Sequence, residues 1–260
     1  IAALFLAGYI PGILTGLFLM IVAGILAKKH HYKTFKRSSL NEIVHSFLIA
    51  FPSLLLLVIV IGGIVGGLFT ATEASAIAVL YSVVLGFVYK EIKFNDIPKI
   101  LLDSAKTSAV VMLLIAASMG MSWIMSYENI PQNLSDFLLN ISDNKIIILF
   151  IINILLLFVG IFMDITPAVL IFTPIFLPVV KTLGIDPIQF GIMMVLNLCI
   201  GLCTPPVGSV LFVGVGIAKT SIEKVIRPLL PMFFSMILAL ILITFIPQIT
   251  LWLPRIFNTI

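Results

Sequence analysis

The chain has 260 residues, of which 61% are hydrophobic and 10% are charged. Soluble domains carry about 25% charged residues, so this composition excludes a soluble globular protein, because too few charges are present to cover a core of this size. Lipid is the remaining solvent for so much apolar surface. The composition, with a mean hydropathy of +1.27, therefore predicts an all-α polytopic membrane protein.

The net charge is +4, and most basic residues lie in three connections between apolar segments. Basic connections of membrane proteins usually face the cytoplasm. The connections at 28–46, 90–106 and 219–227 are therefore predicted to be cytoplasmic, and the acidic connection at 126–145 is predicted to lie outside. The basic residues thus indicate topology, and no nucleic-acid partner is expected.

Apolar segments that could form membrane helices follow one another along the chain. A helix of about 20 apolar residues crosses the hydrocarbon core. The candidates are 3–27, 47–68, 74–89, 105–125, 146–162, 167–180, 190–218 and 228–253. Charged and apolar residues mix at 93–104, which is typical of an interfacial arm. No charged segment precedes the first apolar run, so we expect no signal peptide and a sequence cut from a longer one.

The segment 144–185 is predicted to form a re-entrant hairpin with its tip at 163–166. The tip has no Lys or Arg, and its single charge is Asp164. The apolar segment after it, 167–180, would be only about 21 Å long as a helix, which is short for a membrane span. Backbone that is not helical at membrane depth is tolerated against protein or a water-filled cavity, so the tip is a candidate site.

A second interruption lies in the segment 187–218, at Thr204-Pro205-Pro206-Val207-Gly208-Ser209. Two consecutive prolines remove two backbone donors and clash with the preceding turn, so the helix is predicted to break there. The freed backbone groups are expected at the same depth as the hairpin tip. Broken helices that meet in this way bind ions and substrates in secondary transporters.

Asp164 and Thr166 at the tip supply a carboxylate and a hydroxyl beside unwound carbonyls. Such a set of oxygen ligands suits a hard cation such as Na⁺. The alternative is that either side chain caps the helix that opens at Pro167. Thr204 and Ser209 could likewise be ligands at the break, or could bond backbone groups that the prolines free.

Three further features have both a functional and a structural interpretation. Asn197 could line the same cavity or bridge two helices. Thr70 and Glu73 have the spacing of a capping box, with a polar gate as the alternative. Cys199 and Cys203 share a helix face, which favours packing over a disulfide.

Several segments resemble the large membrane subunit, a DctM-like permease, of TRAP (tripartite ATP-independent periplasmic) transporters. They are LFLAGYIPG at 4–12, GLFTATEA at 67–74, GIFMDITP at 160–167, LCTPPVG at 202–208 and FIPQITLWLP at 245–254. Ala71 stands where the family usually has proline. The resemblance covers essentially the whole chain, but it matches only the end of the first of the family's two inverted repeats and all of the second.

The resemblance implies part of an elevator-type, sodium-coupled symporter in the bacterial inner membrane. The implied partners are a small four-helix membrane subunit, a periplasmic solute-binding protein, the missing N-terminal half of the subunit and a carboxylate solute. Na⁺ is the coupling ion and no other cofactor is implied. The implied sodium-binding residues are Gly160, Asp164, Thr166, Thr204 and Pro205. The implied substrate-path residues are Gly208 and Ser209, and Asn197 is a further candidate there.

The resemblance also implies a division of the chain. Residues 1–27 would end the first repeat, 28–46 would be a cytoplasmic connection, and 47–125 would form the scaffold side. Residues 126–260 would form the transport side with the hairpin, the broken helix at about 187–218 and a final helix at 228–253.

Three alternatives remain at the level of sequence. One is a sodium–carboxylate carrier of the same inverted-repeat design that needs no binding protein. Another is an intramembrane aspartyl protease, which would need two facing carboxylates, whereas Asp164 is the one carboxylate expected at depth. The third is a purely structural subunit. No nucleotide-binding motif is present in the sequence, and no catalytic residue is expected.

Overall fold

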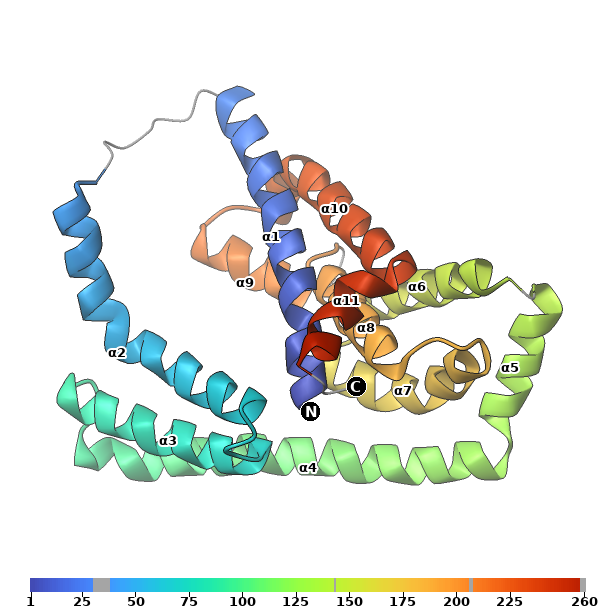
Figure 1. Ribbon diagram of the computed structural model, residues 1–260, viewed down its shortest axis with the longest axis horizontal. Helices are drawn as coiled ribbons and strands as arrows, with labels where there is room; N and C mark the ends of the chain where they lie inside the picture. The colour runs from blue at the N-terminus through green and yellow to red at the C-terminus, as the bar shows by residue number, and fades with distance from the viewer. Residues whose placement is uncertain (30–37, 143, 206–207, 258–260) are drawn as a thin grey trace. The chain divides into compact units, whose positions relative to one another are not determined.

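The computed structural model describes residues 1–29, 38–142, 144–205 and 208–257, and these residues form helices and connections with no β-strand (Figure 1). The helices are α1 (Ala2–Lys29), α2 (Leu40–Val65), α3 (Ala71–Val88), the short 3₁₀ helix η1 (Phe94–Asp96), α4 (Ile97–Tyr127), α5 (Ile130–Ile141), α6 (Lys145–Phe162), α7 (Ile165–Thr182), α8 (Pro187–Leu202), α9 (Ser209–Ile217), α10 (Ile222–Phe245) and α11 (Pro247–Ile256).

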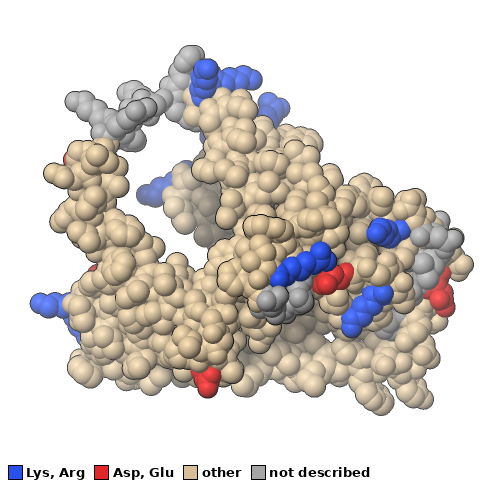
Figure 2. Space-filling view, in the orientation of Figure 1, with Lys and Arg blue, Asp and Glu red and all other residues tan. Residues whose placement is uncertain are grey.

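Seven candidate membrane spans are found among the described residues. They are α1, α2, α3, η1 with α4, α6, α7 and α10. In the face shown in Figure 2, charged side chains are sparse and most of the surface is uncharged. A chain that exposes so many large apolar side chains requires lipid around it. The predicted fold class, an all-α polytopic membrane protein, is confirmed.

The chain divides into two compact units. One unit holds residues 1–5 and 31–110, and the other holds residues 6–30 and 111–260. In the first unit, the hydroxyl of Tyr81 on α3 donates a hydrogen bond to the carbonyl of Pro52 on α2 over 2.7 Å. The predicted capping box is confirmed at the start of α3, where Thr70 accepts from the N–H of Glu73 and donates to its carboxylate. Residues 30–37 of the predicted cytoplasmic connection lie outside the described residues.

The predicted interfacial arm at 93–104 is not a separate helix. Its residues from Ile97 onward continue without a break into α4, which has 31 residues. No Gly or Pro lies between Asp103 and Lys106, so nothing ends the helix there. These two side chains instead form an exposed ion pair one turn apart, with 3.4 Å between Nζ and Oδ1.

The second unit contains the main core, which α6, α7, α8 and α10 build together. Its fully buried side chains include Ile152 and Leu156 of α6, Val179 of α7 and Leu198 of α8. These helices are apolar on more than one face, as expected where a membrane helix also packs against protein. The two arms of the predicted hairpin, α6 and α7, are therefore held against α8.

The hairpin differs from its prediction in the length of its second arm. α7 begins at Ile165 and has 18 residues, so it is about 27 Å long. Pro167 falls in the first turn, where helix N–H groups have no intrahelical acceptor, so a proline there does not prevent the helix from starting earlier. The predicted second arm at 167–180 is therefore too short, and the re-entrant path of the hairpin stays a prediction.

Two other elements differ from the sequence prediction. The connection at 126–145 contains the helix α5, which was missed. The final span predicted at 228–253 is instead two helices, because α10 begins at Ile222 and ends at Phe245 and α11 begins at Pro247. Pro247 has no N–H for the carbonyl of Ile243, which ends α10 at that point.

Candidate functional site

The candidate site is built where α6 and α8 cross. Asn153 of α6 contacts Asn197 of α8, and farther along both helices Gly160 lies against Leu198 and Gly201. The two helices therefore run in the same direction and end at the same level. A Cβ atom on Gly201 would lie 2.6 Å from Cα of Gly160, so only glycine permits this backbone-to-backbone contact.

The hairpin turn follows this crossing directly. α6 ends at Phe162, Met163 is extended, and Asp164 stands at the N-cap of α7 with φ −66° and ψ 159°. Its carboxylate accepts no capping hydrogen bond from the first turn of α7. The alternative prediction, in which the side chain of Asp164 caps α7, is therefore not confirmed. Asp164 and Thr166 are both exposed.

The break after α8 is present as predicted. α8 ends at Leu202, and Thr204 donates its hydroxyl hydrogen to the carbonyl of Ile200 over 2.8 Å. This bond satisfies a backbone carbonyl at the break, which is the structural role predicted for Thr204 as the alternative to ligand binding. The hydroxyl oxygen keeps lone pairs for a further partner. The chain then folds back so that the N–H of Gly208 donates to the carbonyl of Thr204 over 3.2 Å.

Gly208 is needed for this tight return. A Cβ atom there would lie 2.6 Å from the carbonyl oxygen of Leu202 and 2.8 Å from that of Thr204. Pro206, Val207 and the side chain of Ser209 lie outside the described residues. The predicted roles of Gly208 and Ser209 in a substrate path stay predictions.

The electrostatics of this crossing favour a cation. The last carbonyls of a helix have no intrahelical donors and carry the negative end of the helix dipole. Because α6 and α8 end at the same level, Gly160 and Pro205 lie at two such ends. Asp164 follows Gly160 by four residues, and Thr204 follows Gly201 by three. Backbone, hydroxyl and carboxylate oxygens, which are the ligands of hard cations, therefore occur in both segments that follow this crossing.

A buried polar network lies behind the crossing, and sequence reasoning found only one of its members. The side-chain amide of Asn197 donates to the backbone carbonyl of Asn153 over 2.9 Å and to its Oδ1 over 2.8 Å. The amide of Asn153 lies 3.3 Å from the hydroxyl of Thr244 on α10, and Gln189 donates to the carbonyl of Thr244 over 2.9 Å. The signal that could have found them is the isolated polar residue in each apolar helix.

Asn197 is fully buried in this network. Its Oδ1 has no hydrogen-bond partner among the described residues. Asn197 therefore bridges two helices, which is one of the two roles that the sequence predicted for it. Its other predicted role, in a substrate path, stays a prediction. Cys199 and Cys203 are free thiols, which confirms that they form no disulfide.

Comparisons with known proteins agree with this architecture. Residues 1–249 match the family described as "Tripartite ATP-independent periplasmic transporter, DctM component". The chain is 56% identical to the uncharacterized protein YgiK of Salmonella typhimurium, over 99% of this chain and 59% of that protein. It is 41% identical to the sialic acid TRAP transporter large permease protein SiaM of Vibrio cholerae, over 99% of this chain and 60% of that protein.

A third relative is the C4-dicarboxylate TRAP transporter large permease protein DctM of Pseudomonas aeruginosa, which is 40% identical over 98% of this chain and 60% of its own length. The chain therefore spans about three fifths of the length of the curated relatives that it matches.

The apolar helices define a multi-pass membrane protein, and the family match and the relatives place it among transporter permeases rather than among enzymes. The chain belongs to the DctM component family of the tripartite ATP-independent periplasmic transporters, and it is a multi-pass protein of the inner membrane.

Proposed function

We propose that this chain forms the sodium-binding and solute-translocating part of a TRAP transporter that imports a carboxylate together with Na⁺. The ion would be held by Asp164, Thr166 and Thr204 with backbone oxygens at Gly160 and Pro205. A periplasmic binding protein would deliver the solute, and a small four-helix subunit and the remainder of the large subunit would complete the membrane complex. The hairpin would move as an elevator against the rest.

The observation that carries this proposal is the contact between Gly160 and Gly201. It brings the negative ends of α6 and α8 together without an intervening side chain. A cation at this point would be attracted by both helix ends and by the carboxylate of Asp164. Cation binding by the ends of discontinuous helices at the bilayer midplane is the recurrent design of secondary transporters.

The carboxylate class of the solute is supported by the relatives. Two of them are described as permeases for sialic acid and for C4-dicarboxylates, and both solutes are carboxylates. Such a solute is negatively charged, so the membrane potential opposes its entry into the cell. Co-transported Na⁺ would offset this negative charge, which is a physical reason for coupling solute uptake to Na⁺.

The test is uptake of labelled sialic acid and of labelled C4-dicarboxylates into proteoliposomes. These contain the full large subunit, the small subunit and the binding protein, with and without an inward Na⁺ gradient. We expect uptake that requires both Na⁺ and the binding protein. A second readout is the thermal stability of the purified protein, which Na⁺ but not K⁺ should raise because a ligand that binds the folded state stabilises it.

Asp164→Asn should abolish both the Na⁺-dependent uptake and the Na⁺-dependent stabilisation. Asp186→Asn is the matched control. Asp186 also stands at a helix N-cap position, and its carboxylate accepts from the N–H of Ile188 over 2.8 Å, which an amide oxygen can do as well. Accumulation without a gradient, with every subunit folded, would overturn the symport proposal. Uptake without the binding protein would favour the other sodium–carboxylate carrier.

A further inference from the structure

Three residues of α8 that contact α6 follow one another at intervals of four: Met193, Asn197 and Gly201. Residues at this spacing lie on one face of a helix. Met193 and Asn197 both contact Asn153 of α6. Gly201, one turn farther along, lies against Gly160 of the same helix. The buried polar network and the glycine contact at the candidate site are therefore two parts of one interface between α8 and α6.

The glycine contact by itself does not fix the position of α8 along the axis of α6. Glycines let two helix backbones approach closely. Neither Gly160 nor Gly201 has a side chain that could interlock with the other helix or bond to it in one register only. Some other contact must therefore keep the two helix ends at the same level.

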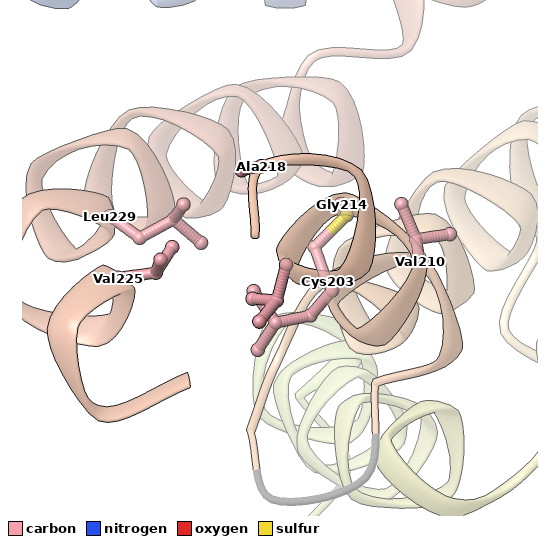
Figure 3. A pocket seen from close by; sticks show the side chains of 8 residues that line it. Cys203, Val210, Gly214, Ala218, Val225 and Leu229 are labelled. Atoms are coloured by element: carbon pink, nitrogen blue, oxygen red, sulfur yellow. The ribbon is translucent and has the colours of Figure 1, made fainter. Parts of the chain in front are cut away.

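The end of α8 meets α9 and α10 across an apolar pocket. Cys203, which follows the helix, lines this pocket of about 310 Å³. Figure 3 shows Val225 and Leu229 of α10 on one side of the pocket and Cys203 and Gly214 on the other. The described residues that line it are apolar apart from the thiol, so they offer no polar group that would fix the axial position of α8.

Asn197 makes a directional contact with α6. Its amide nitrogen donates to the backbone carbonyl oxygen of Asn153 over 2.9 Å and to the side-chain Oδ1 of Asn153 over 2.8 Å. The reversed amide would place an oxygen against these two acceptors, so one orientation alone satisfies them. In that orientation Oδ1 of Asn197 is left without a hydrogen-bond partner among the described residues. An unpaired buried oxygen is costly, so the bonds to Asn153 determine how this side chain lies.

Asn153 is itself held by three groups. Its Nδ2 lies 2.8 Å from the carbonyl oxygen of Leu149, 3.3 Å from Oγ1 of Thr244 on α10 and 3.4 Å from Sδ of Met193. These contacts leave the Oδ1 of Asn153 directed at Asn197. Asn153, Asn197 and Thr244 are all more than nine-tenths buried within this chain, so groups from outside it do not compete for their bonds.

We propose that Asn197 is a positioning residue of the sodium site, which keeps the end of α8 level with the end of α6. Gly201 lies one turn, about 6 Å, beyond Asn197, and Thr204 follows three residues later. An axial shift of α8 would therefore move Thr204 and the last carbonyls of α8 relative to Asp164. The inference rests on the proposed function, because it names the residue that sets the spacing of the proposed ion ligands.

The first test is Asn197→Leu in the complex of the full large subunit with the small subunit. Leucine keeps the core filled and removes both bonds to Asn153. We expect the Na⁺ concentration for half-maximal thermal stabilisation to rise by about tenfold, as when a group that orients a metal ligand is lost. Selectivity for Na⁺ over Li⁺ should fall too, because it depends on the size of the ligand cage. A purely structural residue would lower only the unfolding temperature measured without Na⁺.

Two further variants separate positioning from stability. Asn153→Leu should weaken Na⁺ binding less than Asn197→Leu does, because the backbone carbonyl of residue 153 can still accept from Asn197. Thr250→Val is the matched control. Thr250 is also fully buried and polar, but its hydroxyl bonds to the carbonyl of Pro247 within α11 over 2.9 Å. Thr250→Val should lower the unfolding temperature and leave the affinity and selectivity for Na⁺ unchanged.

Hydrogen exchange on the unaltered protein covers the case in which a variant fails to fold. Coupling between two sites is reciprocal, so Na⁺ in place of K⁺ should slow amide exchange in α6 around Asn153 and leave α11 around Thr250 unaffected.

The outcomes distinguish this inference from the proposed function. If Na⁺ stabilises the unaltered protein, unchanged Na⁺ affinity and selectivity in a folded Asn197→Leu, or equal exchange around Asn153 in the two salts, would overturn this inference alone. If Na⁺ does not stabilise the unaltered protein, the proposed sodium site fails and this inference fails with it.

Discussion

Gly160 of α6 and Gly201 of α8 meet so closely that a Cβ on Gly201 would lie 2.6 Å from Cα of its partner and 3.0 Å from its carbonyl oxygen. The atoms in the way belong to backbone, which cannot rotate aside as a side chain can. This contact sets the distance between the two helix ends at the candidate site, so the site and the packing of α6 on α8 depend on the same two residues.

Gly201→Ala should therefore push α8 away from α6. Overpacking of a tight core typically costs about 1–3 kcal/mol, and the unfolding temperature should fall accordingly. Na⁺-dependent stabilisation should weaken as well, since the two helix ends separate. Gly24→Ala on α1, where a Cβ meets nothing within 4 Å, should cause neither effect. Equal stability of the two variants in thermal unfolding would contradict the backbone contact.

Thr204→Val should lower the apparent affinity for Na⁺ in uptake assays. The substitution removes the hydroxyl that bonds to the carbonyl of Ile200 and that is proposed as a ligand, while the shape of the side chain is nearly kept. Thr204→Ser should restore both the bond and the affinity. If Thr204→Val lowers only the unfolding temperature and leaves the Na⁺ dependence unchanged, the hydroxyl serves the backbone alone.

Asn153 and Asn197 should be energetically coupled. Replacing either one by Leu leaves buried polar atoms of the other without their partner, which costs more than removing both. A double-mutant cycle on the stability of the folded protein should give a coupling energy of about 0.5–2 kcal/mol, the range typical of interhelical hydrogen bonds in membranes and of contacting residues generally. Additive effects of the two substitutions would show that the hydrogen bond contributes nothing.

Thr70→Ala should loosen the start of α3 and leave transport unchanged. The substitution removes the oxygen that accepts from the N–H of Glu73, so amide hydrogen exchange in the first turn of α3 should become faster. Ser39→Ala in the equivalent capping box of α2 should have the same local effect on that helix. A loss of solute uptake in Thr70→Ala, without a comparable loss in Ser39→Ala, would instead favour Glu73 as a polar gate.

Local sequence signals were sufficient where one residue type dictates the backbone. The two prolines after Thr204 predicted the break between α8 and α9, and the spacing of Thr70 and Glu73 predicted the cap of α3. The turn at Asp164 was also visible, because a carboxylate interrupts an otherwise apolar segment. These signals act within one helical turn, so no tertiary information was needed to read them.

Features that depend on tertiary packing could not be predicted from the sequence. Nothing at Gly160 or Gly201 indicates that these two glycines face each other, because the partner of a glycine contact lies on another helix. Pro167 was read as the start of α7, although a proline is tolerated anywhere in the first turn. The role of the Asn153 amide likewise depends on Asn197 and Thr244, which lie on other helices and are brought to it only by the fold.

The parallel course of α6 and α8 has a consequence for the order of assembly during synthesis. All candidate ion ligands lie between Gly160 and Pro205, so they emerge from the ribosome within a short stretch of chain. Contacts that are close in sequence form with little loss of chain entropy, so the hairpin and α8 can assemble while α10 is still being made. Thr244 joins the Asn153 network later, when the ends of α6 and α8 can already have met.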